Sequence, residues 1–170
     1  MSFLDMAKAR WTCRDYDPAK PVEQEKIDAI LQAIALAPTA KNFQPFHVWV
    51  AQSDEAMEKV RQVTPCSYGA PLAFIIAYSA DEAFLRGDGK NFGEIDASIA
   101  GTHIILEASD LGLGSTWIGA YDAAKLHELF PELEGYVDVA LFAVGYPSAS
   151  AQPSPKHSAS KSLDDIVTFI

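Results

Sequence analysis

Apolar runs of strand length alternate along the chain with longer segments that have helical periodicity. Residues 72–78 form a continuous apolar run and residues 136–146 form one that only Asp138 interrupts, which is typical of strands buried on both faces of a sheet. Ile27, Ile30 and Ile34 recur at the spacing of one helix face, so an amphipathic helix is expected there. The pattern as a whole predicts strands over residues 46–51, 72–78, 115–119 and 136–146, and helices over residues 2–9, 23–37, 53–63, 94–111 and 122–130.

Capping and breaking residues mark the ends of several of these helices. Ser2, Ser53 and Asp122 precede predicted helices, and their side chains accept hydrogen bonds from the free N–H groups of a first turn. Pro38 ends the second helix, and Gly112 closes the long fourth one. Residues 10–18 are predicted to form a polar turn, because the prolines that follow prevent a helix.

Helices and buried strands interleave around what the pattern predicts to be a single sheet. The fold class is therefore α/β or α+β, and periodicity leaves both open. A chain of 170 residues with no internal repeat and no boundary is expected to form one domain over residues 1–170. Residues 148–162 are rich in Ser, Pro and Ala, as in a linker, whereas residues 163–170 are apolar again. Such a tail is expected to pack elsewhere, for example on another subunit.

Composition and charge exclude several classes of function. The net charge of −10 argues against a nucleic-acid partner, since such a surface needs clustered Lys and Arg. No apolar stretch approaches the length of a membrane helix, and residues 1–10 do not resemble a signal peptide. Cys13 and Cys66 fit no redox or metal spacing, so free thiols, a cytoplasmic location and no metal site are expected.

Two polar segments are candidates for binding. Arg10, Thr12 and Arg14 place two guanidinium groups and a hydroxyl within five residues, and such groups can converge on a phosphate monoester. Residues 37–46 form a loop with two prolines, in which Asn42 and Gln44 offer donors and acceptors suited to the edge of a heterocycle. Taken separately, the first segment is better explained as two surface arginines near Asp15 and Asp17, and the second as a polar loop before a strand.

In combination and in order, the segments resemble the signature of a known family. Arg-x-Thr-x-Arg-x-Tyr is followed by Ala-Pro-Thr-Ala-x-Asn-x-Gln-Pro-Phe, then by the helix, turn and strand of residues 108–119, and finally by residues 143–147 and 161–166. This order is similar to that of the nitroreductase-like flavoproteins, over nearly the whole chain. The resemblance implies an α+β fold with three α/β/α layers and a central, mainly antiparallel sheet. It also implies a homodimer in which the C-terminal segment is exchanged.

The resemblance assigns roles to individual positions. It implies that the N-terminal turn holds the FMN phosphate, that a loop reaches the flavin bound mainly by the other subunit, and that a strand lines the isoalloxazine ring. Lys161 stands where the family keeps a basic residue for the phosphate; relatives often have two there, so Lys156 or His157 is a candidate to replace the second. The implied FMN-binding residues are Arg10, Trp11 (through its backbone), Thr12, Arg14, Pro38, Thr39, Ala40, Asn42, Trp117, Ile118, Gly119 and Lys161.

The implied activity is that of an FMN-dependent oxidoreductase. A hydride passes from NAD(P)H through flavin N5 to a nitroaromatic, quinone or similar conjugated acceptor in a ping-pong cycle, and no side chain is assigned as a catalytic acid or base, because the cofactor carries the chemistry. Two alternatives stay open. One is a specialised member that consumes flavin, dehalogenates or dehydrogenates a metabolite, and the other is a flavin-binding protein without NAD(P)H turnover. Residues 79–92 are short where larger members insert helices over the flavin.

Overall fold

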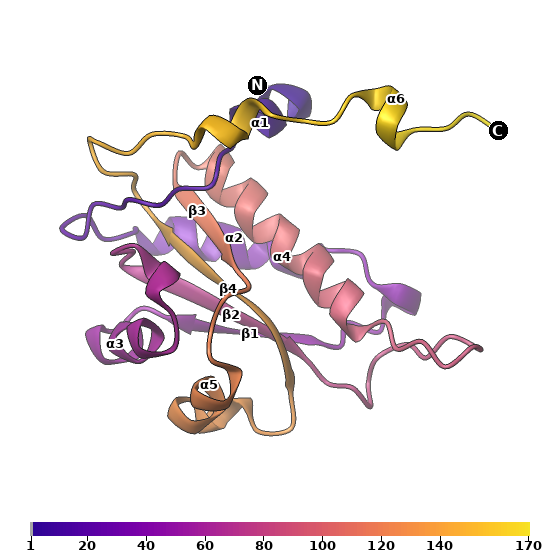
Figure 1. Cartoon of the computed structure of the whole chain (residues 1–170). Helices are drawn as coiled ribbons and strands as arrows, with labels where there is room; N and C mark the ends of the chain where they lie inside the picture. The colour runs from indigo at the N-terminus through magenta and orange to yellow at the C-terminus, as the bar shows by residue number, and fades with distance from the viewer. Residues whose placement is uncertain (1) are drawn as a thin grey trace.

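The central element of the fold is a four-stranded antiparallel sheet (Figure 1). The computed structural model describes residues 2–170. The strands are β1 (Phe46–Ala51), β2 (Leu72–Tyr78), β3 (Gly114–Ile118) and β4 (Val137–Gly145), in the order β1-β2-β4-β3. Every neighbouring pair is antiparallel, with one bulge in β2 between Ile76 and Ala77. All four predicted strands are confirmed to within one residue at each end.

The two central strands divide their apolar side chains between two separate cores. Phe74 of β2 and Phe142 of β4 point to one face, whereas Ile75 and Leu141 point to the other. This is the consequence of a side-chain period of two in a strand that is buried on both faces. The apolar runs of the sequence therefore pack against a helix layer on each face of the sheet.

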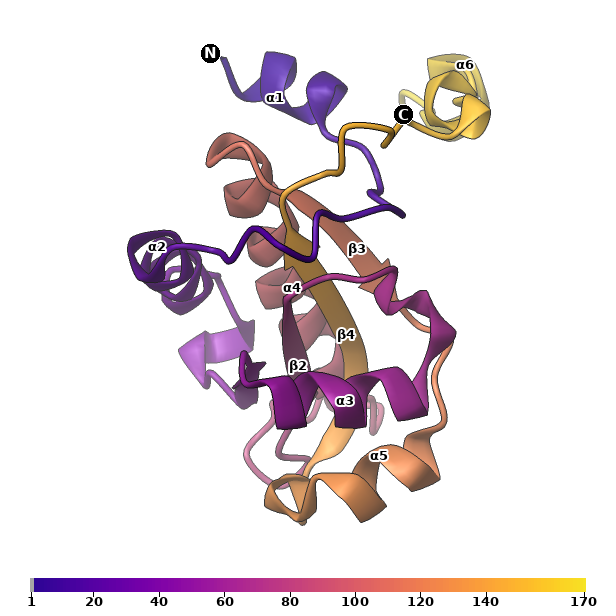
Figure 2. The ribbon, with the colours of Figure 1, turned by 90° about the vertical axis from the view of Figure 1, so that its left-hand side faces the viewer.

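Helices cover both faces of the sheet (Figure 2). One face packs on α2 (Gln24–Ala35) and α4 (Gly93–Asp110), and the other on α3 (Asp54–Val63) and α5 (Ala123–Leu129). The three α/β/α layers and the antiparallel sheet confirm the α+β class that the resemblance implied. The predicted caps are also found, because Ser53 accepts from the Ala56 N–H and Asp122 from the Lys125 N–H.

The N-terminal segment adds to the sheet on the β3 side. It follows α1 (Phe3–Ala9) and is extended, with Thr12 bridged in parallel to Ser115 and Tyr16 bridged to Pro147. The prediction of a turn over residues 10–18 is therefore wrong for the part that precedes Asp17. The prolines do exclude a helix, but the free edge of β3 offers backbone partners that favour extended chain.

The C-terminal part leaves the sheet and carries little buried surface. After β4, the Ser148 and Ser150 hydroxyls donate to the Asp15 carboxylate, which holds the start of the predicted linker against the N-terminal segment. The linker contains a short 3₁₀ helix, Pro155–Ser158, and is followed by α6 (Leu163–Ile166). Residues 155–170 are all exposed, and α1 and α6 lie at the same end of the molecule (Figures 1 and 2).

Among residues 2–170, no helix is both long and apolar enough to cross a bilayer. Over the same range, no three or more His, Cys, Asp or Glu side chains gather as a metal site would require.

Candidate functional site

Alternate side chains of the extended N-terminal segment face a cavity and the protein core. Arg10, Thr12 and Arg14 line a cavity of about 280 Å³. Trp11 and Cys13, which alternate with them, pack on the core of the α3 and α5 face. Successive side chains of extended chain point to opposite sides, so this alternation follows from the backbone. Trp11 accordingly has only its backbone to offer at the cavity.

The opposite wall of the cavity comes from the C-terminal linker. Ser154, Lys156 and His157 complete its lining, and the Ser154 hydroxyl caps the 3₁₀ helix by accepting from the Lys156 N–H at 3.3 Å. Arg10 and His157 also line an adjoining cavity of about 490 Å³ toward α1. Lys161 lines neither cavity. The structure thus places Lys156 and His157, but not Lys161, beside Arg10, Thr12 and Arg14.

The electrostatics of this cavity favour a phosphate monoester. Three of its six lining residues are Arg or Lys, and no carboxylate is among them. The nearest acid in sequence, Asp15, is engaged elsewhere: hydrogen bonds from Ser148 and Ser150 lower the pKa of its carboxyl group. Burial raises the pKa of the neighbouring Cys13 thiol, which stays neutral. A donor set of two guanidinium groups, an ammonium and hydroxyls fits the FMN phosphate chemically.

The strand predicted to line the isoalloxazine ring lies next to this segment. The Trp117 ring leans on the α4 side of the sheet, in an edge contact with Phe142 at 4.7 Å between ring centroids. Ile118 is buried on the opposite face, and Gly119 is exposed where the chain leaves β3. The Thr64 hydroxyl donates to the Ala120 carbonyl at 2.7 Å, which anchors the loop that begins at Gly119.

The loop with Pro38, Thr39, Ala40 and Asn42 lies at the N-terminal end of α4, away from the Arg10–Arg14 segment (Figure 1). Its Ala40 N–H donates to Asp96 in the first turns of α4 at 2.9 Å. The Arg10–Arg14 segment instead pairs with β3, just beyond the end of α4. A helix of 18 residues spans about 27 Å, so one copy of the chain does not bring the loop to the cavity.

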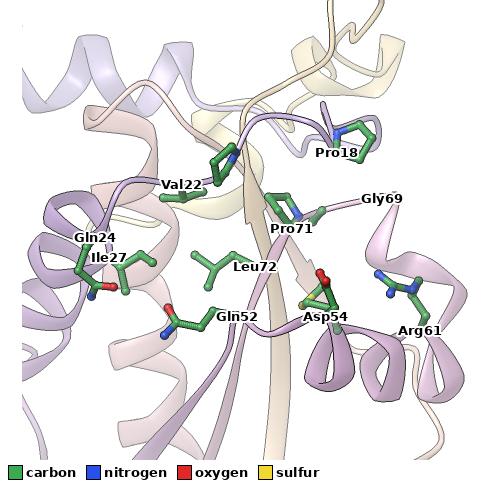
Figure 3. Close-up of a pocket in the computed structure, with 13 residues that line it drawn as sticks. Pro18, Val22, Gln24, Ile27, Gln52, Asp54, Arg61, Gly69, Pro71 and Leu72 are labelled. Atoms are coloured by element: carbon green, nitrogen blue, oxygen red, sulfur yellow. The ribbon is translucent and has the colours of Figure 1, made fainter.

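A second cleft, of about 460 Å³, lies between α2, α3 and the start of β2 (Figure 3). Its inner wall is apolar, with Val22, Ile27 and Leu72, and none of the predicted site residues line it. Its one cation, Arg61, pairs with Glu58 at 2.9 Å. This cleft therefore lacks the convergent cations that a phosphate requires.

Comparison with known proteins identifies the family. The model of the family described as "Nitroreductase family" matches residues 7–67 and 65–146, which is most of the chain. The chain belongs to the nitroreductase family. The family model includes the Arg10–Arg14 segment, the Pro38–Asn42 loop and β3.

Individual nitroreductases agree with this. A protein of Methanothermobacter thermautotrophicus named "Putative NADH dehydrogenase/NAD(P)H nitroreductase" is 32% identical over 157 residues, which cover 87% of this chain and 78% of that protein. A nitroreductase family protein of Clostridium difficile has a crystal structure with a TM-score of 0.92 and 32% identity, covering 99% of this chain and 98% of its own. An FMN-dependent nitroreductase of the same species has a TM-score of 0.78 and 25% identity, covering 98% of both chains.

Sequence reasoning missed one residue in this nitroreductase that contacts the predicted loop. Asp96 is buried inside α4, where its carboxyl group accepts the Ala40 N–H. A signal was present, because Asp96 shares the inner face of the helix with Ala100 and Ile104. An acid on an apolar stripe requires a polar partner.

Proposed function

We propose that this nitroreductase is an FMN-dependent NAD(P)H oxidoreductase that works as a homodimer. The observation that carries the proposal is the cavity whose lining combines Arg10, Arg14 and Lys156 with the Thr12 hydroxyl and includes no acid. A region of this kind is unusual in a chain with a net charge of −10. The names of related proteins, which include NAD(P)H nitroreductases and an FMN-dependent nitroreductase, support the same cofactors.

The residues of the chain would bind and orient the cofactor. Arg10 and Thr12 would hold the phosphate, with Lys156 and His157 closing the cavity from the linker side. Arg14 lies at the other end of the segment, where its cation would stabilise negative charge that develops on the ring. The ring would lie beside β3 against Trp117 and Gly119, with only the backbone of Ile118 available, because the Ile118 side chain is buried.

The bound flavin would supply the redox chemistry, accepting a hydride from NAD(P)H and passing two electrons to the acceptor. We propose a nitroaromatic, a quinone or a similar conjugated molecule as the acceptor, bound in turn with NAD(P)H at one site.

The homodimer is proposed from three features that leave apolar side chains or backbone groups only partly covered. Ile95, Ile99 and Leu106 form an outer apolar stripe on α4, at the i, i+4, i+11 spacing that a second helix matches. The tail after α6 is exposed, with the Phe169 side chain 96% accessible. The outer edge of β1 has no neighbour in the described sheet, so a tail from a second copy has a strand edge to pair with.

A dimer would also account for the distance between the Pro38–Asn42 loop and the Arg10–Arg14 cavity within one copy of the chain. A second copy would bring its Pro38–Asn42 loop to the cavity that one copy alone does not complete. Each flavin would then be held by Arg10–Arg14 of one chain and by the loop of the other.

The test is an anaerobic absorbance spectrum of the purified protein with FMN, before and after NADH or NADPH. Flavin bands that bleach and return on addition of a nitroaromatic or quinone support the oxidoreductase. Bound flavin that neither nucleotide reduces contradicts NAD(P)H turnover, and absence of flavin binding contradicts the whole proposal.

The phosphate site is tested by removing one cation at a time. Arg10→Ala should fold and bind FMN about 10- to 100-fold more weakly, because a charge-assisted hydrogen bond is lost. Lys156→Ala should weaken binding more than Lys161→Ala, which is the matched control from the same linker. Wild-type affinity in Arg10→Ala would remove Arg10 from the phosphate site.

A further inference from the structure

A single carboxyl group from α4 anchors the loop that carries Pro38, Thr39, Ala40 and Asn42. Asp96 is 1% exposed, and its Oδ1 accepts the Ala40 N–H at 2.9 Å. The other hydrogen bonds of residues 39–44 run within the loop, from the Asn42 and Gln44 N–H groups to Thr39 and from the Phe43 N–H to Ala40. Among the described residues, Asp96 is therefore the one hydrogen-bond partner that joins residues 39–44 to another element.

The loop is held in a conformation that its residues do not favour. Lys41, Asn42 and Gln44 have φ values of 56°, 57° and 52°, in the left-handed region that costs free energy for any residue with a Cβ. Strained backbone of this kind persists only where surrounding contacts fix it, and it concentrates at ligand clamps. A loop with three such residues needs an anchor outside itself.

The anchor itself carries a cost. The Asp96 Oδ2 atom is buried and has no hydrogen-bond partner among residues 2–170. A buried acceptor without a donor is unfavourable, and each one in a native protein calls for an explanation. An apolar residue at this position would remove that cost, but it would also release the Ala40 N–H.

We infer that Asp96 is a positioning residue for the flavin site. It fixes the Ala40 amide and so holds residues 39–44 ready to contact the flavin bound by the partner subunit. This inference rests on the proposed function and goes beyond it, because it assigns a role to a side chain that touches neither flavin nor substrate. A purely structural alternative exists: a carboxyl group in the first turns of α4 also interacts favourably with the helix dipole.

Two substitutions and one control separate these roles. Asp96→Ala removes the acceptor, whereas Asp96→Asn keeps an oxygen that can accept the Ala40 N–H. Glu94→Gln is the matched control, since Glu94 is an exposed acid of the same helix turn. FMN affinity is measured by flavin fluorescence at a temperature where every variant is folded, together with kcat and KM.

The positioning role predicts a selective effect on flavin. Asp96→Ala should weaken FMN binding about 10-fold, and Asp96→Asn should restore it to within about 3-fold of wild type. Glu94→Gln should leave FMN affinity unchanged. A lower melting temperature in Asp96→Ala with unchanged FMN affinity would overturn the inference in favour of the structural alternative.

Mixed dimers test whether Asp96 acts across the subunit interface. Chains with Arg10→Ala and chains with Asp96→Ala are coexpressed with different tags, and the heterodimer is purified through both. One of its two sites then combines an intact Arg10 with an intact loop from the other chain. The expected result is one FMN bound per dimer with wild-type affinity, although each variant alone binds weakly.

The outcomes are distinguishable from failure of the proposed function. Weak binding at both sites of the heterodimer would overturn the inference that Asp96 serves the partner's flavin. Wild-type protein that binds no FMN would instead contradict the proposed function itself, whatever the Asp96 variants do.

Discussion

Removal of the Tyr16 hydroxyl tests how the cofactor segment is fixed to the sheet. Tyr16 is 2% exposed, and its hydroxyl lies 2.8 Å from the Thr116 hydroxyl and 3.0 Å from the Ala143 carbonyl, with one proton to donate to either of these two acceptors. The Thr116 hydroxyl in turn donates to the Cys13 carbonyl. One phenol therefore joins the Arg10–Arg14 segment to both β3 and β4, and Tyr16→Phe deletes that junction while keeping the ring.

The magnitude follows from what the substitution leaves behind. Thr116 can still donate to Cys13, and the Ala143 carbonyl stays in the sheet, so no buried donor is stranded. The expected loss is about 1–2 kcal/mol of unfolding free energy, the usual net value for one or two buried hydrogen bonds. For a chain of this size that corresponds to a fall of about 2–8 °C in melting temperature.

The pH dependence of the stability difference between the wild type and Tyr16→Phe gives a second test. Burial raises the pKa of the Tyr16 phenol above its ordinary value of 10.0. A group whose pKa is raised by folding contributes stability below its unfolded pKa, and this contribution is lost as the pH rises above it. Between pH 7.5 and pH 10.5 the unfolding free energy of the wild type should fall by about 0.8 kcal/mol more than that of Tyr16→Phe. The reason is that only the wild type can ionise this phenol on unfolding.

Urea unfolding followed by tryptophan fluorescence at pH 7.5 and pH 10.5 measures both quantities. Tyr146→Phe is the matched control, because its hydroxyl bonds at the surface to Glu23 and Lys26 and should contribute less than about 0.5 kcal/mol. A loss in Tyr16→Phe no larger than in Tyr146→Phe would refute the role of the junction. The difference in unfolding free energy between wild type and Tyr16→Phe should be smaller at pH 10.5 than at pH 7.5. An unchanged difference would refute the assignment of a buried, neutral phenol.

Two further substitutions test packing and charge away from the cofactor segment. A Cβ at Gly101 would lie 2.5 Å from the Phe142 ring, so Gly101→Ala should destabilise the protein by about 1–3 kcal/mol in thermal unfolding; no loss would show that α4 can move off the sheet. Burial acts to raise the pKa of Asp138, but hydrogen bonds from Tyr121 and His127 outweigh it and leave the pKa lowered. Because a lowered pKa contributes stability above about pH 4 that is lost on acidification, Asp138→Asn should be less stable than wild type at pH 7 and should converge with it at pH 3 in urea unfolding, and a constant difference would contradict this.

Periodicity and capping residues were sufficient to predict nearly all helices and strands. Pro38 and Gly112 are local signals, and the runs that became β2 and β4 are apolar on both faces, so each element could be located without knowledge of its neighbours. Whether the sheet was parallel or antiparallel depends on pairing between distant segments, and only the family resemblance indicated it. The extended form of residues 10–14 was missed for the same reason, since its pairing partner, β3, lies about 100 residues further along the chain.

The candidate site was predictable where the residues themselves carry the chemistry. Arg10, Thr12 and Arg14 were identified from spacing and resemblance, and the structure places them in one cavity. The sequence did not decide which linker lysine lines the cavity, because Lys156 and Lys161 are equivalent basic residues until the 3₁₀ helix directs one of them inward. The left-handed backbone at Lys41 and Asn42 carried no signal, since residues with a Cβ rarely adopt it.

The alternation of side chains in residues 10–14 has a consequence for how this segment can change. Even-numbered positions serve the cavity and odd-numbered positions serve the core, so a substitution of one parity should alter ligand affinity and a substitution of the other should alter folding. A deletion or insertion of one residue would invert the phase, turning Trp11 and Cys13 toward the ligand and the guanidinium groups toward the core. A single substitution in this segment therefore acts on ligand affinity or on folding, whereas a change of its length by one residue would disturb both.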